Sequence, residues 1–205
     1  MKLFWSSRSP FVRKVMVVAH EIGVTDRIER IPVVVAMTNP PTPEVTQHNP
    51  LNKIPTLITD EGLTLFESVV ICEYLDSLHA GERLFPVDAP RRWKALRWHA
   101  LGSGMLEALL LWRSESRRPA GTQLSVVLAA FDDKIRGSLD LLEREAAEIR
   151  AEAFGIGHVG VGCALAYADF RFPELKWRDG RPALAALYAQ IQARPSMRAT
   201  EFVDA

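Results

Sequence analysis

The sequence predicts an α/β domain with a mixed sheet, joined by a short linker to an all-helical domain. Three observations predict this fold class. The first 78 residues change their hydrophobic period repeatedly, in the order strand, helix, strand and then strand, strand, helix. Residues 79–90 contain Gly81, Pro86 and Pro90, which is typical of a linker. Beyond the linker the apolar residues recur at helical spacing, so we expect domains at residues 1–78 and 91–205.

The composition is typical of a soluble globular protein and excludes several functional classes. The chain has 205 residues, of which 48% are hydrophobic and 24% charged, and its formal net charge is zero. A neutral chain of this kind gives no reason to expect a nucleic-acid or membrane partner. No apolar run approaches the roughly 20 residues that span a bilayer, and the N-terminus does not have the pattern of a signal peptide. Cys72 and Cys163 lie far apart, which favours a reducing, cytoplasmic location and predicts no metal site.

The first strand and helix place a serine hydroxyl at a special position. The apolar run Leu3–Trp5 predicts a short buried strand, and Pro10 suits the first position of a helix. Ser9 is then the N-cap, and Gly23 ends a helix that runs to about Ile22. Backbone N–H groups and the positive end of the helix dipole converge on the N-cap, so that an anion such as a thiolate is stabilised there. The alternative is that Ser9 only caps the helix.

The rest of the first domain predicts a mixed sheet. A strand at residues 28–33 follows the first helix, and a strand–helix–strand order implies a parallel crossover. Residues 34–49 predict a surface loop with one helical turn near Glu44. Residues 56–59 and 63–66 predict two antiparallel strands joined by a turn, and residues 67–78 predict a helix.

The second domain predicts a helical bundle around one buried helix. The helices are expected at residues 91–115, 123–153, 159–167 and 182–194, with Pro195 closing the last. Residues 159–167 are almost purely apolar, which is typical of a central helix buried on all sides. Gly102 and Gly104 lie inside the first of these helices, where each glycine costs about 1 kcal/mol relative to alanine. Their small size would let another backbone or a ligand come close.

Several motifs together resemble the cytosolic glutathione transferases, over essentially the whole chain. The first domain carries Asn-Pro-Leu-Asn-Lys-Ile-Pro-Thr-Leu at 49–57, Asp-Glu-Gly at 60–62, Leu-Phe-Glu-Ser at 65–68 and Cys-Glu-Tyr-Leu at 72–75. Ser-Pro-Phe-Val-Arg-Lys-Val at 9–15 looks like a bacterial branch of that family, as do residues 162–165 and 169–173. The resemblance implies a thioredoxin-like first domain with a four-stranded mixed sheet, a helical second domain and a homodimer. It implies no cofactor other than glutathione as co-substrate.

The resemblance also implies how glutathione would be held. Pro55 would follow a cis peptide bond and present the backbone of Ile54 to the cysteinyl part of glutathione. Glu67 would take the ammonium and Ser68 the carboxylate of the γ-glutamyl end, although plain helix capping is the alternative for both. Lys53 could pair with the glycine carboxylate or be a solvated surface lysine.

The resemblance implies that Ser9 meets the sulfur of glutathione. A hydrogen bond from its hydroxyl, together with the helix N-terminus, would favour the thiolate and so produce a better nucleophile. Ser6 and Ser7 are alternatives for this role. We prefer Ser9 because it directly precedes Pro10, where a redox-active relative would carry its first cysteine.

The electrophile is expected to bind between the domains, against the first helix of each. The candidate residues are aromatic, methionine or leucine side chains at helical spacing, for which a place in the core is the alternative. They are Phe11, Met105, Leu109 and Trp112. Arg8 and Arg113 could orient an anionic or polar co-substrate, or could be solvated.

The predicted function is attack of the glutathione thiolate on a small, hydrophobic electrophile. A non-catalytic glutathione-binding or interaction protein on the same fold is the alternative. A glutathione-dependent reductase or peroxidase is disfavoured by serine at position 9. One departure concerns the buried helix, where relatives carry a Ser/Thr-x-x-Asp capping box but this chain has Gly155 and His158. Restoring threonine and aspartate at these positions is expected to raise the melting temperature.

Overall fold

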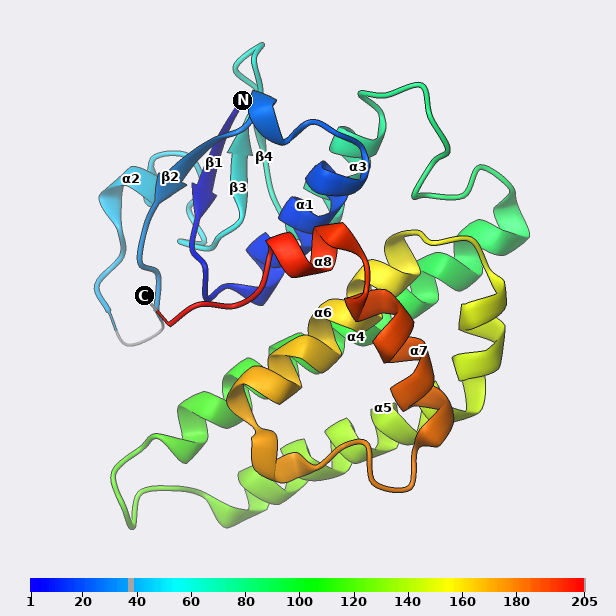
Figure 1. Cartoon of the computed structure of the whole chain (residues 1–205). Coiled ribbons are helices and arrows are strands. Elements are labelled where there is room, and N and C mark those ends of the chain that lie inside the picture. The colour runs from blue at the N-terminus through cyan, green and yellow to red at the C-terminus, as the bar shows by residue number, and fades with distance from the viewer. Residues whose placement is uncertain (37–38, 205) are drawn as a thin grey trace. The chain divides into compact units, whose positions relative to one another are not determined.

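A computed structural model describes residues 1–36 and 39–204 of the chain. Met37 and Thr38, which belong to the predicted loop at 34–49, and the final Ala205 lie outside the described residues. The chain forms two compact units (Figure 1). The first combines Met1–Phe85 with the chain from Pro195 onward, and the second is Pro86–Arg194.

The first unit contains the predicted mixed sheet. Its strands are β1 (Lys2–Trp5), β2 (Glu29–Pro32), β3 (Thr56–Ile58) and β4 (Thr64–Leu65). They lie in the order β2-β1-β3-β4, with β1 parallel to β2 and antiparallel to β3, and β4 antiparallel to β3. The four-stranded sheet with two kinds of pairing confirms the prediction for the described residues.

Two helices cover one face of this sheet, and a short one lies on the other side (Figure 1). The covering helices are α1 (Pro10–Glu21) and α3 (Ser68–Asp76), and the short helix α2 (Pro43–Thr46) is the predicted turn near Glu44. Leu3, Val15, Leu57 and Ile71 form the core between sheet and helices, with no accessible surface. After α1 the chain turns at Gly23, whose φ of 72° confirms it as the predicted stop, and continues through a 3₁₀ turn at Thr25–Arg27.

The end of the chain returns to the first unit, which the sequence did not predict. Pro195 was expected only to close a helix, but it also begins α8 (Pro195–Ala199), which packs against α1. Proline is compatible with both because it cannot continue a helix yet suits the first turn of the next. The Arg13 guanidinium holds the tail, since its Nη2 donates to the Met197 carbonyl at 3.0 Å and its Cζ lies 4.6 Å from the Phe202 ring centroid.

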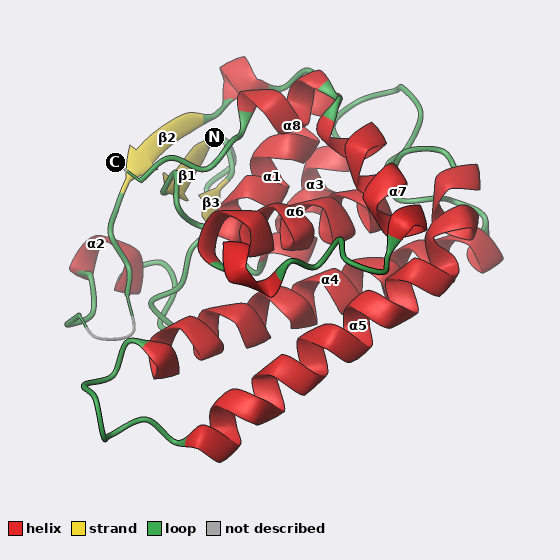
Figure 2. Ribbon diagram, turned by 60° about the horizontal axis from the view of Figure 1, so that its bottom comes forward, coloured by secondary structure: helices red, strands yellow, loops and turns green. Residues whose placement is uncertain are grey.

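The second unit is built on a pair of long antiparallel helices (Figure 2). These are α4 (Ala89–Ser116) and α5 (Ser125–Ala151), followed by α6 (Ile156–Arg171), a 3₁₀ turn at Pro173–Leu175, and α7 (Pro182–Gln192). Ion pairs at 2.5–3.0 Å cross from α4 to α5, and their antiparallel order follows the helix directions. The pairs are Arg91–Glu152, Lys94–Glu148 and Arg97–Glu145.

Helix α6 is buried from Ile156 to Ala168, which confirms the prediction of a central apolar helix. It begins three residues earlier and ends four residues later than the expected 159–167. Gly102 of α4 meets it backbone to backbone, because a Cβ at Gly102 would lie 2.4 Å from the Gly160 carbonyl. Of the two options for the glycines, a close backbone is therefore what Gly102 accommodates, whereas a Cβ at Gly104 would meet nothing within 4 Å.

An imidazole caps α6 in place of a hydroxyl and a carboxylate. His158 Nδ1 accepts the Gly155 N–H at 3.2 Å, and Nε2 lies 2.9 Å from the Ile149 carbonyl at the end of α5. The two bonds assign the tautomer with the proton on Nε2. The expectation that Gly155→Thr with His158→Asp stabilises the protein is therefore revised: aspartate cannot donate, and the buried Ile149 carbonyl would lose its partner at a cost of about 1–3 kcal/mol.

Candidate functional site

Ser9 is the N-cap of α1, as predicted. Its backbone is extended, with φ −83° and ψ 118°, and its Oγ accepts the Val12 N–H at 3.3 Å. The Ser9 carbonyl accepts the Arg13 N–H at 3.0 Å, which is the first bond of the helix ladder. Pro10 has no N–H, and the N–H of Phe11 has no carbonyl of the helix to bond. Because its oxygen serves as the acceptor, the Ser9 hydroxyl still has its own proton to donate.

The neighbouring serines use their hydroxyl groups differently. Ser7 Oγ donates to the Val203 carbonyl at 2.9 Å, so that its proton ties the C-terminal tail to the loop before α1. Ser6 Oγ accepts the Arg8 N–H at a long 3.4 Å. Among these three serines, Ser9 alone combines the N-cap position with an acceptor bond from the helix itself.

A buried asparagine shapes the loop that carries Ile54 and Pro55. Asn49 is 1% exposed, and its Nδ2 donates to the Lys53 carbonyl at 3.1 Å and to Thr56 Oγ1 at 3.0 Å. Thr56 Oγ1 donates in turn to the Lys53 carbonyl at 2.9 Å. The Ile54–Pro55 peptide is cis, as the resemblance implied. Sequence reasoning missed the role of Asn49, although an asparagine before Pro50 is a recognisable turn signal.

Ile54 lies just outside the strand ladder. The pairing of β3 with β1 begins at Thr56, which is opposite Phe4. The backbone at Ile54 therefore extends the line of β3 beyond its paired part, as an added peptide strand requires. Lys53 is exposed, and its side chain can reach either solvent or an anion.

Glu67 and Ser68 lie at the start of α3, with a division of labour that the sequence did not predict. Glu67 is the N-cap rather than the first helical residue, and its Oε1 accepts the Val69 N–H at 3.1 Å. The Ser68 hydroxyl is fully buried and donates to Glu67 Oε2 at 3.2 Å. Ser68 thus orients the exposed carboxylate of Glu67, while the backbone N–H groups of the first turn of α3 face an incoming anion.

The predicted electrophile residues differ in how much surface they offer. Met105 is 2% exposed and Leu109 has no accessible surface, so both belong to the core of the second unit. Trp112 is half-buried, with its ring centroid 5.0 Å from that of Phe172. In the first unit, Phe11 is half-buried and Lys14 Nζ lies 4.8 Å from its ring centroid. Phe11 and Trp112 therefore have surface to offer a ligand, and the assignment of an electrophile site to these residues stays a prediction.

The charged candidates named for a co-substrate also separate. Arg8 is exposed, whereas Arg113 is half-buried in the last turn of α4. The charge of Arg113 acts on the hydroxyl of Tyr167, which lies on α6 in the same unit.

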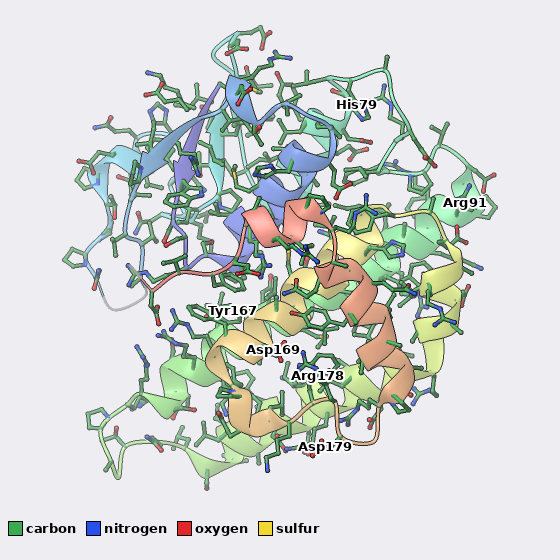
Figure 3. The ribbon with its side chains drawn as sticks, in the orientation of Figure 1. His79, Arg91, Tyr167, Asp169, Arg178 and Asp179 are labelled. Atoms are coloured by element: carbon green, nitrogen blue, oxygen red, sulfur yellow. The ribbon has the colours of Figure 1, made fainter. Side chains whose placement is uncertain are left out.

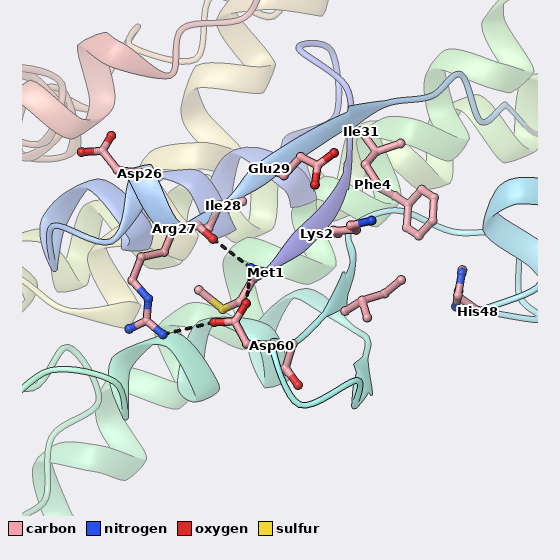
Figure 4. Close-up of a pocket in the computed structure, with 12 residues that line it drawn as sticks. Met1, Lys2, Phe4, Asp26, Arg27, Ile28, Glu29, Ile31, His48 and Asp60 are labelled. Atoms are coloured by element: carbon pink, nitrogen blue, oxygen red, sulfur yellow. Dashed lines mark hydrogen bonds and ion pairs between the residues drawn. The ribbon is translucent and has the colours of Figure 1, made fainter.

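An open pocket in the first unit lies away from all of these residues (Figure 4). Lys2 and Phe4 of β1, with Ile31 of β2, line it on the sheet face that does not carry Leu3. The Phe4 ring lies against His48 at 5.6 Å between centroids. At the rim Asp60 binds the N-terminal ammonium at 2.5 Å, and none of the predicted glutathione residues lines the pocket.

Two searches of residues 1–36 and 39–204 bear on other classes of function. They contain no cluster of three histidine, cysteine or acidic side chains placed to hold a metal ion. Among the helices in the same residues, none has the length and apolar character needed to cross a bilayer.

Comparison with known proteins gives a consistent result in both halves of the chain. Residues 8–78 match the N-terminal domain of the glutathione S-transferases, and residues 125–190 match their C-terminal domain. The uncharacterized GST-like protein YibF of Escherichia coli K12 is 32% identical over 98% of both chains.

Solved structures agree with this result. A glutathione transferase family member from Pseudomonas fluorescens Pf-5, solved with bound glutathione, is 42% identical over 98% of both chains, with a TM-score of 0.93. A second structure from that organism, with bound S-(propanoic acid)-glutathione, is 41% identical over 98% of both chains, with a TM-score of 0.89. With both domain types matched and relatives similar along almost the whole length, the chain belongs to the cytosolic glutathione S-transferase family.

Proposed function

We propose that this protein is a glutathione transferase that binds glutathione on its first unit and activates the thiol for attack on a small, hydrophobic electrophile. The observation that carries the proposal is the Ser9 hydroxyl, which caps α1 and keeps a proton to donate. In the reaction the thiol proton passes to solvent and a carbon–sulfur bond forms. The electrophile then either loses its leaving group or, after addition, takes a proton from solvent.

The start of α1 favours the thiolate over the thiol. The helix dipole contributes roughly half a positive charge at this end, and the Ser9 hydroxyl would donate a hydrogen bond to the sulfur. Hydrogen bonds to charged groups are worth about 1.5–3 kcal/mol, so that Ser9 could lower the thiol pKa by about one to two units.

The remaining contacts would hold the tripeptide in place. The backbone at Ile54, fixed by Asn49, would pair with the cysteinyl part as an added strand does. The exposed carboxylate of Glu67, oriented by Ser68, suits the γ-glutamyl ammonium, and the first turn of α3 suits the carboxylate beside it. Lys53 would face the glycine carboxylate.

The relatives support binding of glutathione. The two Pseudomonas structures hold glutathione and a glutathione conjugate, and this chain matches them over 98% of its length. The conjugate carries a propanoic acid on sulfur, which is the product type expected from such a transfer. We also propose a homodimer, which light scattering of the purified protein tests directly.

Two serine variants test the proposal. Ser9→Ala should lower kcat/KM for glutathione conjugation by about 10–100-fold, the kinetic equivalent of one charged hydrogen bond. Ser7→Ala removes a hydroxyl from the same loop and should leave the rate within a factor of about two. A large loss in Ser7→Ala alone would assign the sulfur contact to Ser7 instead.

The alternative of a non-catalytic binder makes a different prediction. A binder would be retained on immobilised glutathione but would not accelerate conjugation of any member of a broad electrophile panel. Retention with turnover supports the enzyme, and absence of both contradicts the proposal as a whole.

A further inference from the structure

Three arginines and a tyrosine gather at one end of the second unit. Arg113 and Arg117 lie one turn apart at the end of α4, and Tyr167 and Arg171 lie one turn apart at the end of α6. Figure 3 labels Tyr167 on this part of α6. The charges of all three arginines act on the Tyr167 hydroxyl, and Arg171 is also hydrogen-bonded to it. We call these four residues the arginine cluster.

The packing of α4 on α6 explains why they meet. The two helices run in the same direction, since Ala95 lies against Gly157 and Gly102 against Gly160. One to two turns before the helix ends, the rings of Trp112 and Phe172 are still in contact. Their C-terminal ends are therefore side by side, and residues in their last turns share one neighbourhood.

The charge at this place is strongly positive. Each helix end contributes roughly half a negative charge, so that two ends offset about one of the three guanidinium charges. The acidic residues adjacent in sequence are bound elsewhere. Asp169 forms a two-point ion pair with Arg178 at 2.6 and 2.7 Å, and Glu115 accepts the Leu124 N–H at 2.8 Å.

Tyr167 adds a neutral donor to this positive field. It is 2% exposed, and burial raises the pKa of its hydroxyl although the charges of Arg113 and Arg171 oppose that shift. The hydroxyl therefore stays protonated near neutral pH and can donate a hydrogen bond. The half-buried Trp112, which precedes Arg113, adds an aromatic surface beside the charges.

We propose that the arginine cluster binds the carboxylate of an aromatic or unsaturated acid, so that the electrophile conjugated by this protein is an anion. Guanidinium groups bind carboxylates through two parallel hydrogen bonds, and a ring or double bond would lie on Trp112. This inference rests on the proposed function, which sets the reaction, and adds the chemical class of the acceptor.

A matched pair of substrates tests the acceptor class. 4-Chloro-3,5-dinitrobenzoate and 4-chloro-3,5-dinitrobenzamide have nearly the same shape and differ in charge. In both, the thiolate sulfur bonds to the carbon that carries chlorine, chloride leaves, and the thiol proton goes to buffer. Each kcat/KM is divided by the rate constant of the uncatalysed reaction, which removes the difference in intrinsic reactivity.

The expected result is a preference for the anion that depends on the cluster. The normalised kcat/KM should be about tenfold higher for the benzoate, and Arg113→Gln or Arg171→Gln should abolish that ratio. Tyr167→Phe, which keeps the ring, should reduce the ratio by about threefold. Arg136→Gln is the matched control, because it removes an equal charge from a surface pair on α5 and should leave the ratio unchanged.

Three outcomes would overturn or separate the claims. Equal normalised rates for the two substrates overturn the inference, as does an equal loss for both in the arginine variants. If neither substrate turns over, the proposed function fails, and calorimetry with unreactive 3,5-dinitrobenzoate and 3,5-dinitrobenzamide decides the inference alone. Preferential benzoate binding that Arg171→Gln abolishes supports the cluster, and equal binding of the two compounds overturns it.

Discussion

Replacing Gly102 with alanine should destabilise the second unit, although alanine is the better helix former. The new Cβ would lie 2.4 Å from the carbonyl carbon and oxygen of Gly160, and 2.9 Å from the nitrogen of Val161. These are backbone atoms of a buried helix and cannot move aside like the end of a side chain. Overpacking of this kind costs about 3 kcal/mol, of which the helix propensity of alanine offsets about 1 kcal/mol.

The net loss of roughly 2 kcal/mol corresponds to a fall in melting temperature of about 4–8 °C for a chain of this size. Differential scanning calorimetry measures it. Gly104→Ala is the matched control, because its Cβ would meet nothing within 4 Å. It should gain about 1 kcal/mol and raise the melting temperature by about 2–4 °C. If both variants gained stability, α4 and α6 could not be in backbone contact, and the juxtaposition of their C-terminal ends would lose its basis.

Two other predictions concern polar groups that the fold has buried. Burial lowers the pKa of His158 in the folded state, with Arg194 adding to the shift while the Ile149 carbonyl and Glu152 oppose it. The unfolded chain therefore binds more protons below about pH 6.5, and stability should fall as the pH drops through the folded pKa. Urea unfolding between neutral and mildly acidic pH should show this slope, and His158→Asn should reduce it; a slope equal in both proteins would contradict the assignment. Asn49→Ala should cost about 1–3 kcal/mol and weaken glutathione binding in calorimetry without changing the thiol pKa, because the lost bonds shape only the loop at Ile54. Unchanged affinity in a folded Asn49→Ala protein would remove that loop from the site.

Features set by neighbouring residues could be predicted from the sequence. Ser9 followed by Pro10 signals a helix start, and the structure has the cap bond from Val12. Gly23 signals a helix end, and its left-handed backbone confirms it. The buried run in α6 likewise needed no knowledge of its neighbours, because a helix that is apolar on all sides has to be central.

Features that depend on distant parts of the chain could not be predicted. The bond from Ser7 joins residues 196 positions apart, and the sequence does not show that the tail returns to α1. His158 caps its helix through the carbonyl of Ile149, a partner that only the packing of α5 on α6 provides. Met105 and Leu109 had the spacing expected of a ligand-facing stripe, but spacing does not distinguish a stripe that faces a ligand from one that faces the core.

The central claim is that the start of α1 holds the glutathione sulfur as a thiolate. The most direct measurement is the pKa of the thiol of bound glutathione, followed by ultraviolet absorbance of the thiolate in the wild-type protein and in Ser9→Ala. We predict a pKa lowered by at least about one unit in the wild-type complex, corresponding to about 1.4 kcal/mol, and largely restored in the variant. A bound thiol that titrates at its ordinary value, or one whose pKa Ser9→Ala leaves unchanged, would contradict the account.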